Sequence, residues 1–237
     1  MASTDVWSRW KDFGTARHEF NSARVQNGLL ADVEKKILVW LARRTPGWIN
    51  SDHLTALALV AMAAAGGAYF YSREHGWALW LVNASLALNW LGDSLDGTLA
   101  RERKLLRPRY GFYVDHLCDA FSALFLFAGL ATSGYMHPAI ATGLLLAYLL
   151  LSIEAYLATY TIGTFKISQF KFGPTELRLL LATGNAFVVL HSRIHVFGYE
   201  LRLFDFGGAI GIAGMVLVLL WVAGRHTWTL YQEERLW

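Results

Sequence analysis

The sequence predicts an all-α integral membrane protein with six transmembrane helices, preceded by a cytoplasmic amphipathic helix. Hydrophobic residues make up 55% of the chain and charged residues only 16%, whereas a soluble domain carries about 25% charged residues. The apolar residues come in long runs, and a membrane-spanning helix needs about 20 of them in succession. Ten Trp and ten Tyr residues suit a protein with two membrane–water interfaces, where aromatic rings gather.

The first predicted helix covers Asn27 to Arg44. Its apolar residues recur three and four positions apart, with basic residues between them, which is typical of a helix that lies in the membrane interface. A helix packed on the cytoplasmic ends of the spans would show the same pattern. The opening residues are polar and of mixed charge, so they do not indicate a secretory signal. We therefore expect a cytoplasmic region over 1–50 and a single transmembrane domain over 51–237.

Six apolar segments follow this helix. The first and the last are nearly uninterrupted, whereas the second and third carry aspartates at the ends that face each other along the chain. No linker rich in Pro, Gly or Ser divides them, which favours one domain. The predicted spans are residues 53–72, 77–99, 111–133, 138–162, 176–194 and 206–225.

The distribution of basic residues predicts the orientation in the membrane. An even number of spans places both termini on one side, and eighteen of the 21 Lys and Arg residues lie on that side. Only Arg73, Arg193 and Arg202 lie on the other. The positive-inside rule therefore places the termini and the 101–109 loop in the cytoplasm. Basic residues along membrane edges attract anionic lipid headgroups, so the positive net charge does not require a nucleic-acid partner.

Four aspartates lie at the facing ends of the second and third predicted spans. Asp93 and Asp96 are three residues apart, and Asp115 and Asp119 are four apart, so each pair shares one helix face. The short connection makes these helices antiparallel neighbours, and the two pairs can converge. Four close carboxylates repel one another unless a cation lies between them, and oxygen ligands favour Mg²⁺ or Mn²⁺. Helix capping or pairing with Arg would account for only one or two of these residues.

Small residues accompany the aspartates. Gly97, Ala100 and Gly111 leave little side-chain bulk beside the acidic residues, which lets a flat ligand group approach the backbone. Tight helix packing is the alternative reason for small residues at these positions. Arg101 lies four residues after Gly97, where it can meet an anionic ligand. These features together predict a metal-dependent diphosphate site, and they do not identify the nucleotide.

The pattern D-x2-D-G-x2-A-R-x9-G-x3-D-x3-D, from Asp93 to Asp119, resembles the signature of the CDP-alcohol phosphotransferase family. All eight signature residues are present, and the nine-residue spacer is within the family's usual range. Family members transfer a phosphate-linked group from a CDP-linked donor to a hydroxyl acceptor and release CMP. The resemblance therefore implies an Mg²⁺- or Mn²⁺-dependent enzyme of phospholipid synthesis, with at least one lipid substrate.

The resemblance also implies roles for the signature residues. Asp93, Asp96 and Asp115 would hold the metal, and Asp119 would complete the metal site. Asp119 would also act as the general base that takes the proton of the acceptor hydroxyl. The residues expected to line the pocket for the CDP moiety are Gly97, Ala100, Arg101 and Gly111.

The stretch before the first span loosely resembles a donor-site segment of the family. It places Asn50 and Thr55 as candidate donor-site residues, and helix capping is the alternative for both. The D-H-L-C-D run from Asp115 to Asp119 is similar to choline- and ethanolamine-phosphotransferases, which transfer from a CDP-amino-alcohol to diacylglycerol. Those eukaryotic enzymes have extra spans that this chain lacks. The alternative is therefore CDP-diacylglycerol-dependent phosphatidyl transfer to a small polar alcohol such as glycerol phosphate, inositol or serine.

Two further residues are candidates for acceptor binding. Glu154 lies inside the fourth predicted span with Tyr156 and Tyr160 at helical spacing, and a carboxylate with aromatic rings can hold an ammonium group. A hydrogen-bonded structural role is the alternative. Arg178, near the start of the fifth span, can reach a phosphate or extend to the membrane interface.

A small ion transporter or channel is the alternative from another functional class, with the acidic cluster as its ion site. It predicts internal repeats or broken helices in matching halves, and the sequence has neither. Gly207 and Gly211 form a pair of small residues four apart, typical of helix packing or a dimer interface. Members of the family are commonly homodimers, so the resemblance implies a homodimer.

Overall fold

The structure is a computed structural model that describes residues 31–162, 174–190, 193–196 and 199–235. Residues 27–30, at the start of the predicted amphipathic helix, lie outside this part of the chain. The described elements follow in chain order: α2 Ala31–Arg44, α3 Ser51–Tyr71, α4 Ala78–Glu102, α5 Pro108–Thr132, α6 Pro138–Ile162, α7 Pro174–Leu190, β1 Arg193–Val196, β2 Tyr199–Arg202 and α8 Leu203–Glu233.

Each of the six predicted spans corresponds to a helix, from α3 to α8. Four of them (α3, α5, α6 and α8) are long and apolar enough to cross a membrane, by length and composition. Helix α4 has 25 residues but includes two aspartates and ends in Arg101 and Glu102, and α7 has only 17 residues. The four apolar helices indicate a membrane protein.

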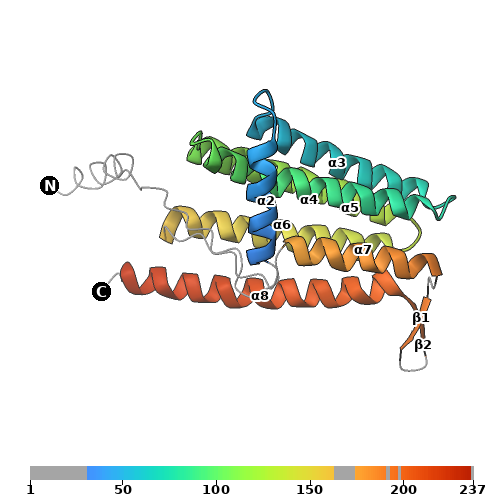
Figure 1. The fold of residues 1–237 in the computed structure, drawn as a ribbon. Coiled ribbons are helices and arrows are strands. Elements are labelled where there is room, and N and C mark those ends of the chain that lie inside the picture. The colour runs from blue at the N-terminus through green and yellow to red at the C-terminus, as the bar shows by residue number, and fades with distance from the viewer. Residues whose placement is uncertain (1–30, 163–173, 191–192, 197–198, 236–237) are drawn as a thin grey trace.

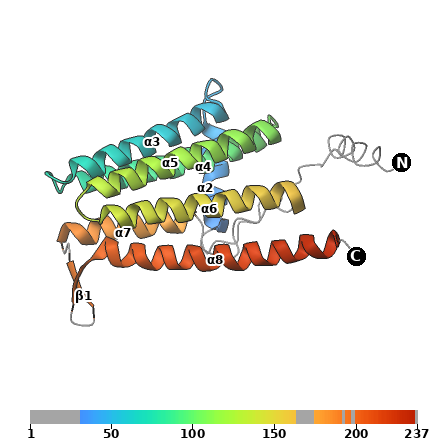
Figure 2. The same ribbon diagram turned by 180° about the vertical axis from the view of Figure 1, so that it is seen from behind.

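Helices α3 to α8 lie side by side in an elongated bundle, and α2 crosses them at a steep angle (Figure 1). The same arrangement seen from behind shows α5 and α6 in front of α4 and α7 (Figure 2). Helix α3 packs against both α4 and α5, and α6 packs against both α5 and α8. Helix α7 packs mainly against α4. The two helices that carry the acidic signature are therefore both held by α3.

Glycines allow α3 to approach its neighbours very closely. A Cβ atom on Gly92 of α4 would lie 2.6 Å from the carbonyl oxygen of Leu54, and one on Gly129 of α5 would lie 2.5 Å from that of Gly66. Any side chain at these positions would push the helices apart. The missing side chains thus determine how α4 and α5 sit on α3.

A buried polar network fixes α7 against α3 and α4. The hydroxyl of Tyr69 donates to the side-chain oxygen of Asn185 over 2.8 Å, and the amide nitrogen of Asn185 donates to Asn83 over 2.8 Å. The amide of Asn83 in turn donates to the carbonyl oxygen of Ala182 over 3.1 Å. Because a satisfied buried network rigidifies the helices it joins, this contact orients α7 with respect to α4.

The predicted end of the fifth span is wrong. Helix α7 ends at Leu190, and residues 193–196 form a strand that pairs antiparallel with 199–202. Ile194, Val196 and Tyr199 are residue types that favour strands, and they alternate with polar residues in this segment. The hairpin leads directly into α8, which is longer at both ends than the predicted 206–225.

The predicted amphipathic segment is helical over its described part, α2. Leu38 and Ala42 are buried and form a small core with residues of α3 and α4, namely Leu54, Leu95 and Leu99. The guanidinium of Arg103 donates to the carbonyl oxygens of Thr45 and Pro46, over 2.8 and 3.0 Å. These contacts attach α2 and the segment after it to the end of α4.

Candidate active site

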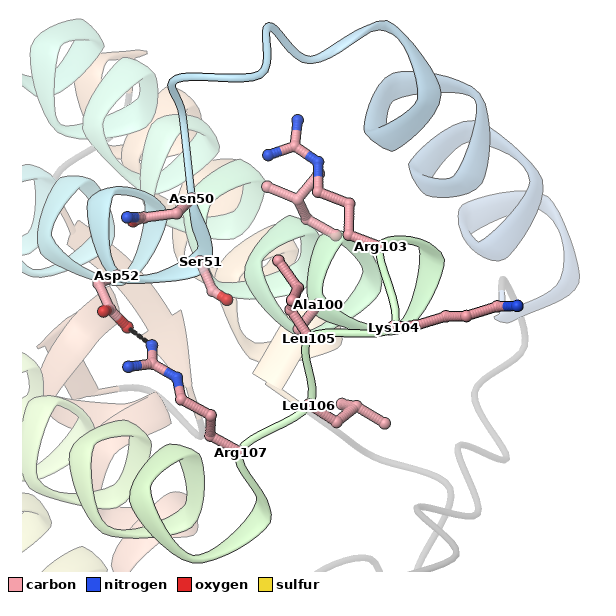
Figure 3. A pocket seen from close by; sticks show the side chains of 10 residues that line it. Asn50, Ser51, Asp52, Ala100, Arg103, Lys104, Leu105, Leu106 and Arg107 are labelled. Atoms are coloured by element: carbon pink, nitrogen blue, oxygen red, sulfur yellow. Dashed lines mark hydrogen bonds and ion pairs between the residues drawn. The ribbon is translucent and has the colours of Figure 1, made fainter.

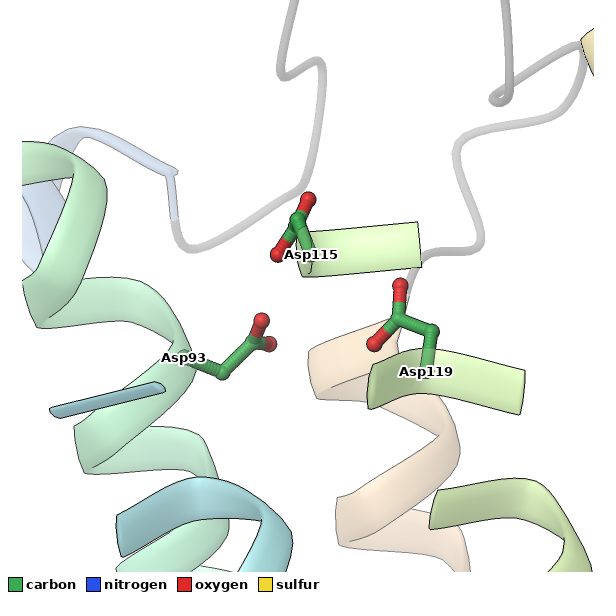
Figure 4. A group of neighbouring side chains, drawn as sticks. All are labelled: Asp93, Asp115 and Asp119. Atoms are coloured by element: carbon green, nitrogen blue, oxygen red, sulfur yellow. The ribbon is translucent and has the colours of Figure 1, made fainter. Parts of the chain in front are cut away.

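Three carboxylates converge between the C-terminal half of α4 and the N-terminal half of α5. Asp93 of α4 and Asp115 and Asp119 of α5 each offer an oxygen, and these oxygens lie within 4.8 Å of one another. Their side chains point toward a common space in Figure 4. Asp115 and Asp119 share a face of α5 because they are four residues apart. Carboxylate oxygens in such a group are the ligands that Mg²⁺ and Mn²⁺ prefer, so these residues fit a hard divalent cation.

Asp96, the fourth aspartate of the signature, lies outside this group of three. Its side chain is buried, with 9% of the residue exposed, and its Oδ2 accepts a 2.6 Å hydrogen bond from the hydroxyl of Thr55. The hydroxyl of Ser51 donates to the backbone oxygen of Asp96 over 3.3 Å. Two residues of α3 therefore hold Asp96, and the sequence had brought Thr55 forward as a candidate donor-site residue.

Asn50 has the capping geometry that was the alternative for it. Its side-chain oxygen accepts from the backbone N–H of His53 over 3.0 Å, and its own N–H donates to the His53 ring over 3.2 Å. This reciprocal arrangement satisfies donors at the start of α3. It fixes the first turn of α3, which also carries Ser51, a hydrogen-bond donor to Asp96 of α4.

Arg178 reaches the acidic group from α7. Its Nη2 lies 2.7 Å from Oδ2 of Asp93, and both side chains are largely shielded, at 13% and 17% exposure. Arg178 is seven residues before Asn185, so the two lie on the same face of α7. The buried network around Asn185 therefore helps to aim the guanidinium at α4.

The four signature residues expected at the CDP moiety lie along α4 and at the start of α5. The guanidinium of Arg101 lies over Gly97, 3.5 Å from the position that a Cβ atom would take there, and donates to the hydroxyl of Thr98. At Gly111 a Cβ atom would meet nothing within 4 Å. The space beside Gly111 is therefore open, whereas the Arg101 guanidinium occupies the space beside Gly97.

Ala100 lines a cavity of about 450 Å³ between the start of α3 and the α4–α5 connection (Figure 3). Ser51 lines the same cavity and donates to the backbone oxygen of Asp96, so the cavity adjoins α4 beside Asp96. Arg107 forms an ion pair with Asp52 at its edge. The lining residues are Asn50, Ser51, Asp52, Leu99, Ala100, Arg103, Lys104, Leu105, Leu106 and Arg107.

An aromatic cluster adjoins the acidic group, and the sequence did not predict it as a unit. The ring of His116 lies 4.1 Å from that of Phe112 and 5.0 Å from that of Tyr156, measured between centroids. Nδ1 of His116 lies 2.6 Å from the carbonyl oxygen of Phe112. The spacing of four between Phe112 and His116 was a readable signal, whereas the contribution of Tyr156 from α6 depends on how the helices pack.

Glu154 faces α8 rather than the three-carboxylate group. Its Oε1 lies 2.6 Å from Nδ1 of His226, and Tyr160, expected to flank it, is 81% exposed. Tyr156 points instead toward His116. His226 was not predicted as a partner of Glu154, because the last span was expected to end at residue 225. A carboxylate inside a membrane span is usually paired with a polar residue of another helix, so the position of Glu154 itself indicated that a partner should exist.

A glutamate of α2 contacts the two helices that carry Asp93 and Arg178. Oε1 of Glu34 accepts from the indole N–H of Trp90 over 2.8 Å and from the hydroxyl of Ser94 over 3.3 Å. The hydroxyl of Thr175, in the first turn of α7, lies 3.5 Å from the same oxygen. Glu34 was not among the predicted site residues, since nothing in its local sequence indicates where α2 docks.

Comparison with known proteins agrees with the geometry. No curated protein matches the chain. A family model, CDP-alcohol phosphatidyltransferase, matches residues 48–227, which is most of the chain and includes every residue of the acidic signature. The chain therefore belongs to the CDP-alcohol phosphatidyltransferase family.

Proposed function

We propose that this enzyme transfers a phosphate-linked group from a CDP-linked donor to a hydroxyl acceptor at the site formed by Asp93, Asp115 and Asp119. Its family supports phospholipid synthesis by transfer of a phosphate group from a CDP-alcohol. The observation that carries the proposal is the convergence of these three carboxylates next to the guanidinium of Arg178. Acidic oxygens with an adjacent cation are suited to a metal-bound diphosphate.

The divalent cation would be held by Asp93, Asp115 and Asp119, with Asp96 as the further candidate ligand. Mg²⁺ or Mn²⁺ bound there would neutralise negative charge on the diphosphate and on the CMP leaving group. Asp96 has a different environment, because the Thr55 hydroxyl already occupies one of its oxygens. We therefore propose a second role for Asp96: its hydrogen bond from Thr55 fixes the acidic part of α4 against α3.

The protein's own groups position the reactants and move the proton. Asp119 takes the proton from the acceptor hydroxyl, so that the acceptor oxygen forms a bond to phosphorus while the bond from phosphorus to CMP breaks. Arg178 pairs with phosphate oxygens, a geometry for which a guanidinium is well suited. The packing of α4 and α5 on α3 holds these groups at fixed separations, which is the main requirement for such a transfer.

The donor nucleotide would occupy the space beside α4. Gly97, Ala100, Arg101 and Gly111 are proposed to line it, and the cavity of about 450 Å³ at Ala100 has the size of a small-ligand site. Ser51 connects this cavity to Asp96. A nucleotide in the cavity would then lie beside Asp96, with its diphosphate directed along α4 toward the acidic group.

Two observations bear on the substrates. The aromatic cluster of Phe112, His116 and Tyr156 favours a CDP-choline or CDP-ethanolamine donor with diacylglycerol, because aromatic faces attract an ammonium group. Arg178 instead favours a phosphate-bearing acceptor, as in CDP-diacylglycerol-dependent transfer. Glu154, paired with His226, remains a candidate acceptor residue.

We also propose that all six helices from α3 to α8 cross the membrane, with both termini and the active site in the cytoplasm. Helix α4 has 25 residues and is about 37 Å long at 1.5 Å per residue, longer than a hydrocarbon core of about 30 Å. Its aspartates lie in its C-terminal half, where α2 packs. On this proposal residues 51–237 form one transmembrane domain and residues 1–50 are cytoplasmic. We further propose that the enzyme is a homodimer.

The decisive experiment is a substrate panel with the purified full-length chain. CDP-choline, CDP-ethanolamine and CDP-diacylglycerol would each be combined with diacylglycerol, glycerol phosphate, inositol or serine. CMP release and the lipid product would be measured together, with Asp119→Asn as the inactive control. One donor–acceptor pair should give both products in equal amounts. The absence of CMP with every pair would reject the proposed transfer.

A further inference from the structure

The outer face of α2 carries a cluster of exposed basic and aromatic residues. Ile37 and Trp40 are 45% and 54% exposed, and the guanidinium carbon of Arg44 lies 3.9 Å from the centre of the Trp40 ring. A shallow depression runs along this face, and all of its charged lining residues are cations. It is lined by Lys35, Lys36, Val39, Trp40, Arg43 and Arg44, which we call the basic face of α2.

The inner face of α2 is different in character. Leu38 and Ala42 are buried against α3 and α4, and the carboxylate of Glu34 is directed to Trp90 and Ser94. Arg43 pairs with Glu102 over 3.0 Å but keeps 70% of its side chain exposed. The contacts with the bundle therefore use the apolar residues and Glu34, and leave the basic face outward.

We infer that the basic face of α2 is a docking surface for the headgroups of anionic phospholipids. Clustered Lys and Arg residues complement a phosphodiester, and each adds about 1 kcal/mol of attraction to an anionic membrane surface. The exposed indole of Trp40 and the neighbouring Ile37 suit the boundary between headgroups and acyl chains, where aromatic rings settle. The helix crosses the bundle axis steeply, so its long side can run along a membrane surface (Figure 1).

The same helix is attached to the catalytic helices. Glu34 contacts Trp90 and Ser94, which lie on either side of Asp93 along α4, and Thr175, three residues before Arg178. Lipid bound to the basic face would therefore hold a helix that is itself fixed to the acidic site. The inference concerns lipid binding and does not depend on which transfer reaction the enzyme catalyses.

Binding can be measured with the detergent-purified full-length chain and short-chain lipids. Dihexanoyl phosphatidylglycerol and dihexanoyl phosphatidylcholine would be titrated in parallel while tryptophan fluorescence is recorded. The part of the fluorescence change that is present in the wild type but absent in Trp40→Phe would report lipid bound at the basic face. We expect the anionic lipid to bind more tightly than the zwitterionic one. The double variant Lys35→Gln/Lys36→Gln should weaken anionic-lipid binding about 25-fold, taking about fivefold for each lysine.

The matched control is Arg73→Gln/Arg202→Gln, which removes two exposed cations from the other end of the bundle. It should change the apparent Kd for phosphatidylglycerol by less than twofold. Equal affinity for the two lipids, or an equal loss in the control variant, would overturn the inference. Displacement of the lipid by inorganic phosphate or by soluble polyglutamate at the same charge concentration would also overturn it, in favour of a free anion or an acidic protein. CMP release, assayed separately, would show whether the proposed transfer is intact.

Discussion

The guanidinium of Arg178 lies 2.7 Å from a carboxylate oxygen of Asp93, although the two residues are 85 positions apart in the chain. The pair joins the first turns of α7 to the signature on α4 and places a fixed cation at the edge of the acidic group. Because both side chains are mostly shielded from water, their interaction is stronger than that of an exposed ion pair. The arrangement adds a residue outside the signature to the proposed site.

Replacing Arg178 should therefore reduce activity strongly. Hydrogen bonds to charged groups contribute about 1.5–3 kcal/mol, so we expect Arg178→Gln to lower kcat/KM by about 10- to 150-fold. Arg178→Lys keeps the charge but not the planar guanidinium, and it should recover only part of the loss. Arg225→Gln, on the exposed side of α8, is the control. Wild-type kcat/KM in Arg178→Gln would show that the guanidinium does not act on substrate.

The variants Asp119→Asn and Asp96→Asn should lose activity for different reasons. Asp119→Asn removes the proposed base, and we expect kcat to fall at least about 100-fold while the protein still binds the CDP-donor. Asp96→Asn disturbs the buried contact with Thr55, so it should lose donor binding as well. Steady-state kinetics and binding of the labelled donor separate the two effects. A near-normal kcat in Asp119→Asn would contradict its role as the base.

Activity should depend completely on a divalent cation. Three carboxylates with oxygens within 4.8 Å of one another form a site for a hard cation, and a diphosphate substrate needs charge neutralisation. CMP release should stop in EDTA and return with Mg²⁺ or Mn²⁺. Asp93→Asn should raise the Mg²⁺ concentration needed for half-maximal activity. Undiminished turnover in EDTA would refute the metal assignment.

The α3–α5 contact should be intolerant of a single methyl group. A Cβ atom on Gly129 would lie 2.5 Å from the carbonyl oxygen of Gly66, so Gly129→Ala should lower the free energy of unfolding by about 1–3 kcal/mol. Gly67→Ala is the matched control, since a Cβ atom there would meet nothing within 4 Å. Thermal unfolding in one detergent compares the two variants. Equal Tm values would show that the helices can separate without cost.

The sequence predicted the helices well because apolar run length is a local property. The limits expected for the fourth span, 138–162, are those of α6, and the spacing within 115–119 placed two aspartates on one face of α5. Features that depend on packing between distant segments were missed. The contact of His226 with Glu154 and the docking of Glu34 on α4 are of this kind. The hairpin after α7 was missed because four-residue strands carry too little periodicity beside an apolar helix.

The acidic signature also combines local features that the sequence predicted with contacts between helices that it did not. Spacing alone indicated that four aspartates lie near one another, and three of them form the group of oxygens. The separate environment of Asp96 arises from Thr55 on α3, 41 residues away. Sequence spacing within α4 gives no information on which residue of α3 faces it. The close approach of Gly92 of α4 to Leu54 and Ala58 of α3 helps to set that alignment.

The last prediction concerns the orientation of the acidic site. The proposed CDP-linked donor is expected on the cytoplasmic side, so we expect the connection between α4 and α5 to face the cytoplasm and the turn between α3 and α4 to face the opposite side. Eighteen of the 21 Lys and Arg residues favour this orientation, although those far from a span have less influence. Arg109 and Glu74 are both exposed. The variants Arg109→Cys and Glu74→Cys would be made separately in a Cys118→Ser background. A membrane-impermeant thiol reagent applied to intact cells should label position 74 and leave position 109 unlabelled until the cells are opened. Labelling of 109 alone would place the carboxylates of Asp93, Asp115 and Asp119 outside the cytoplasm, where no CDP-linked donor reaches them, and would reject the orientation and the proposed reaction together.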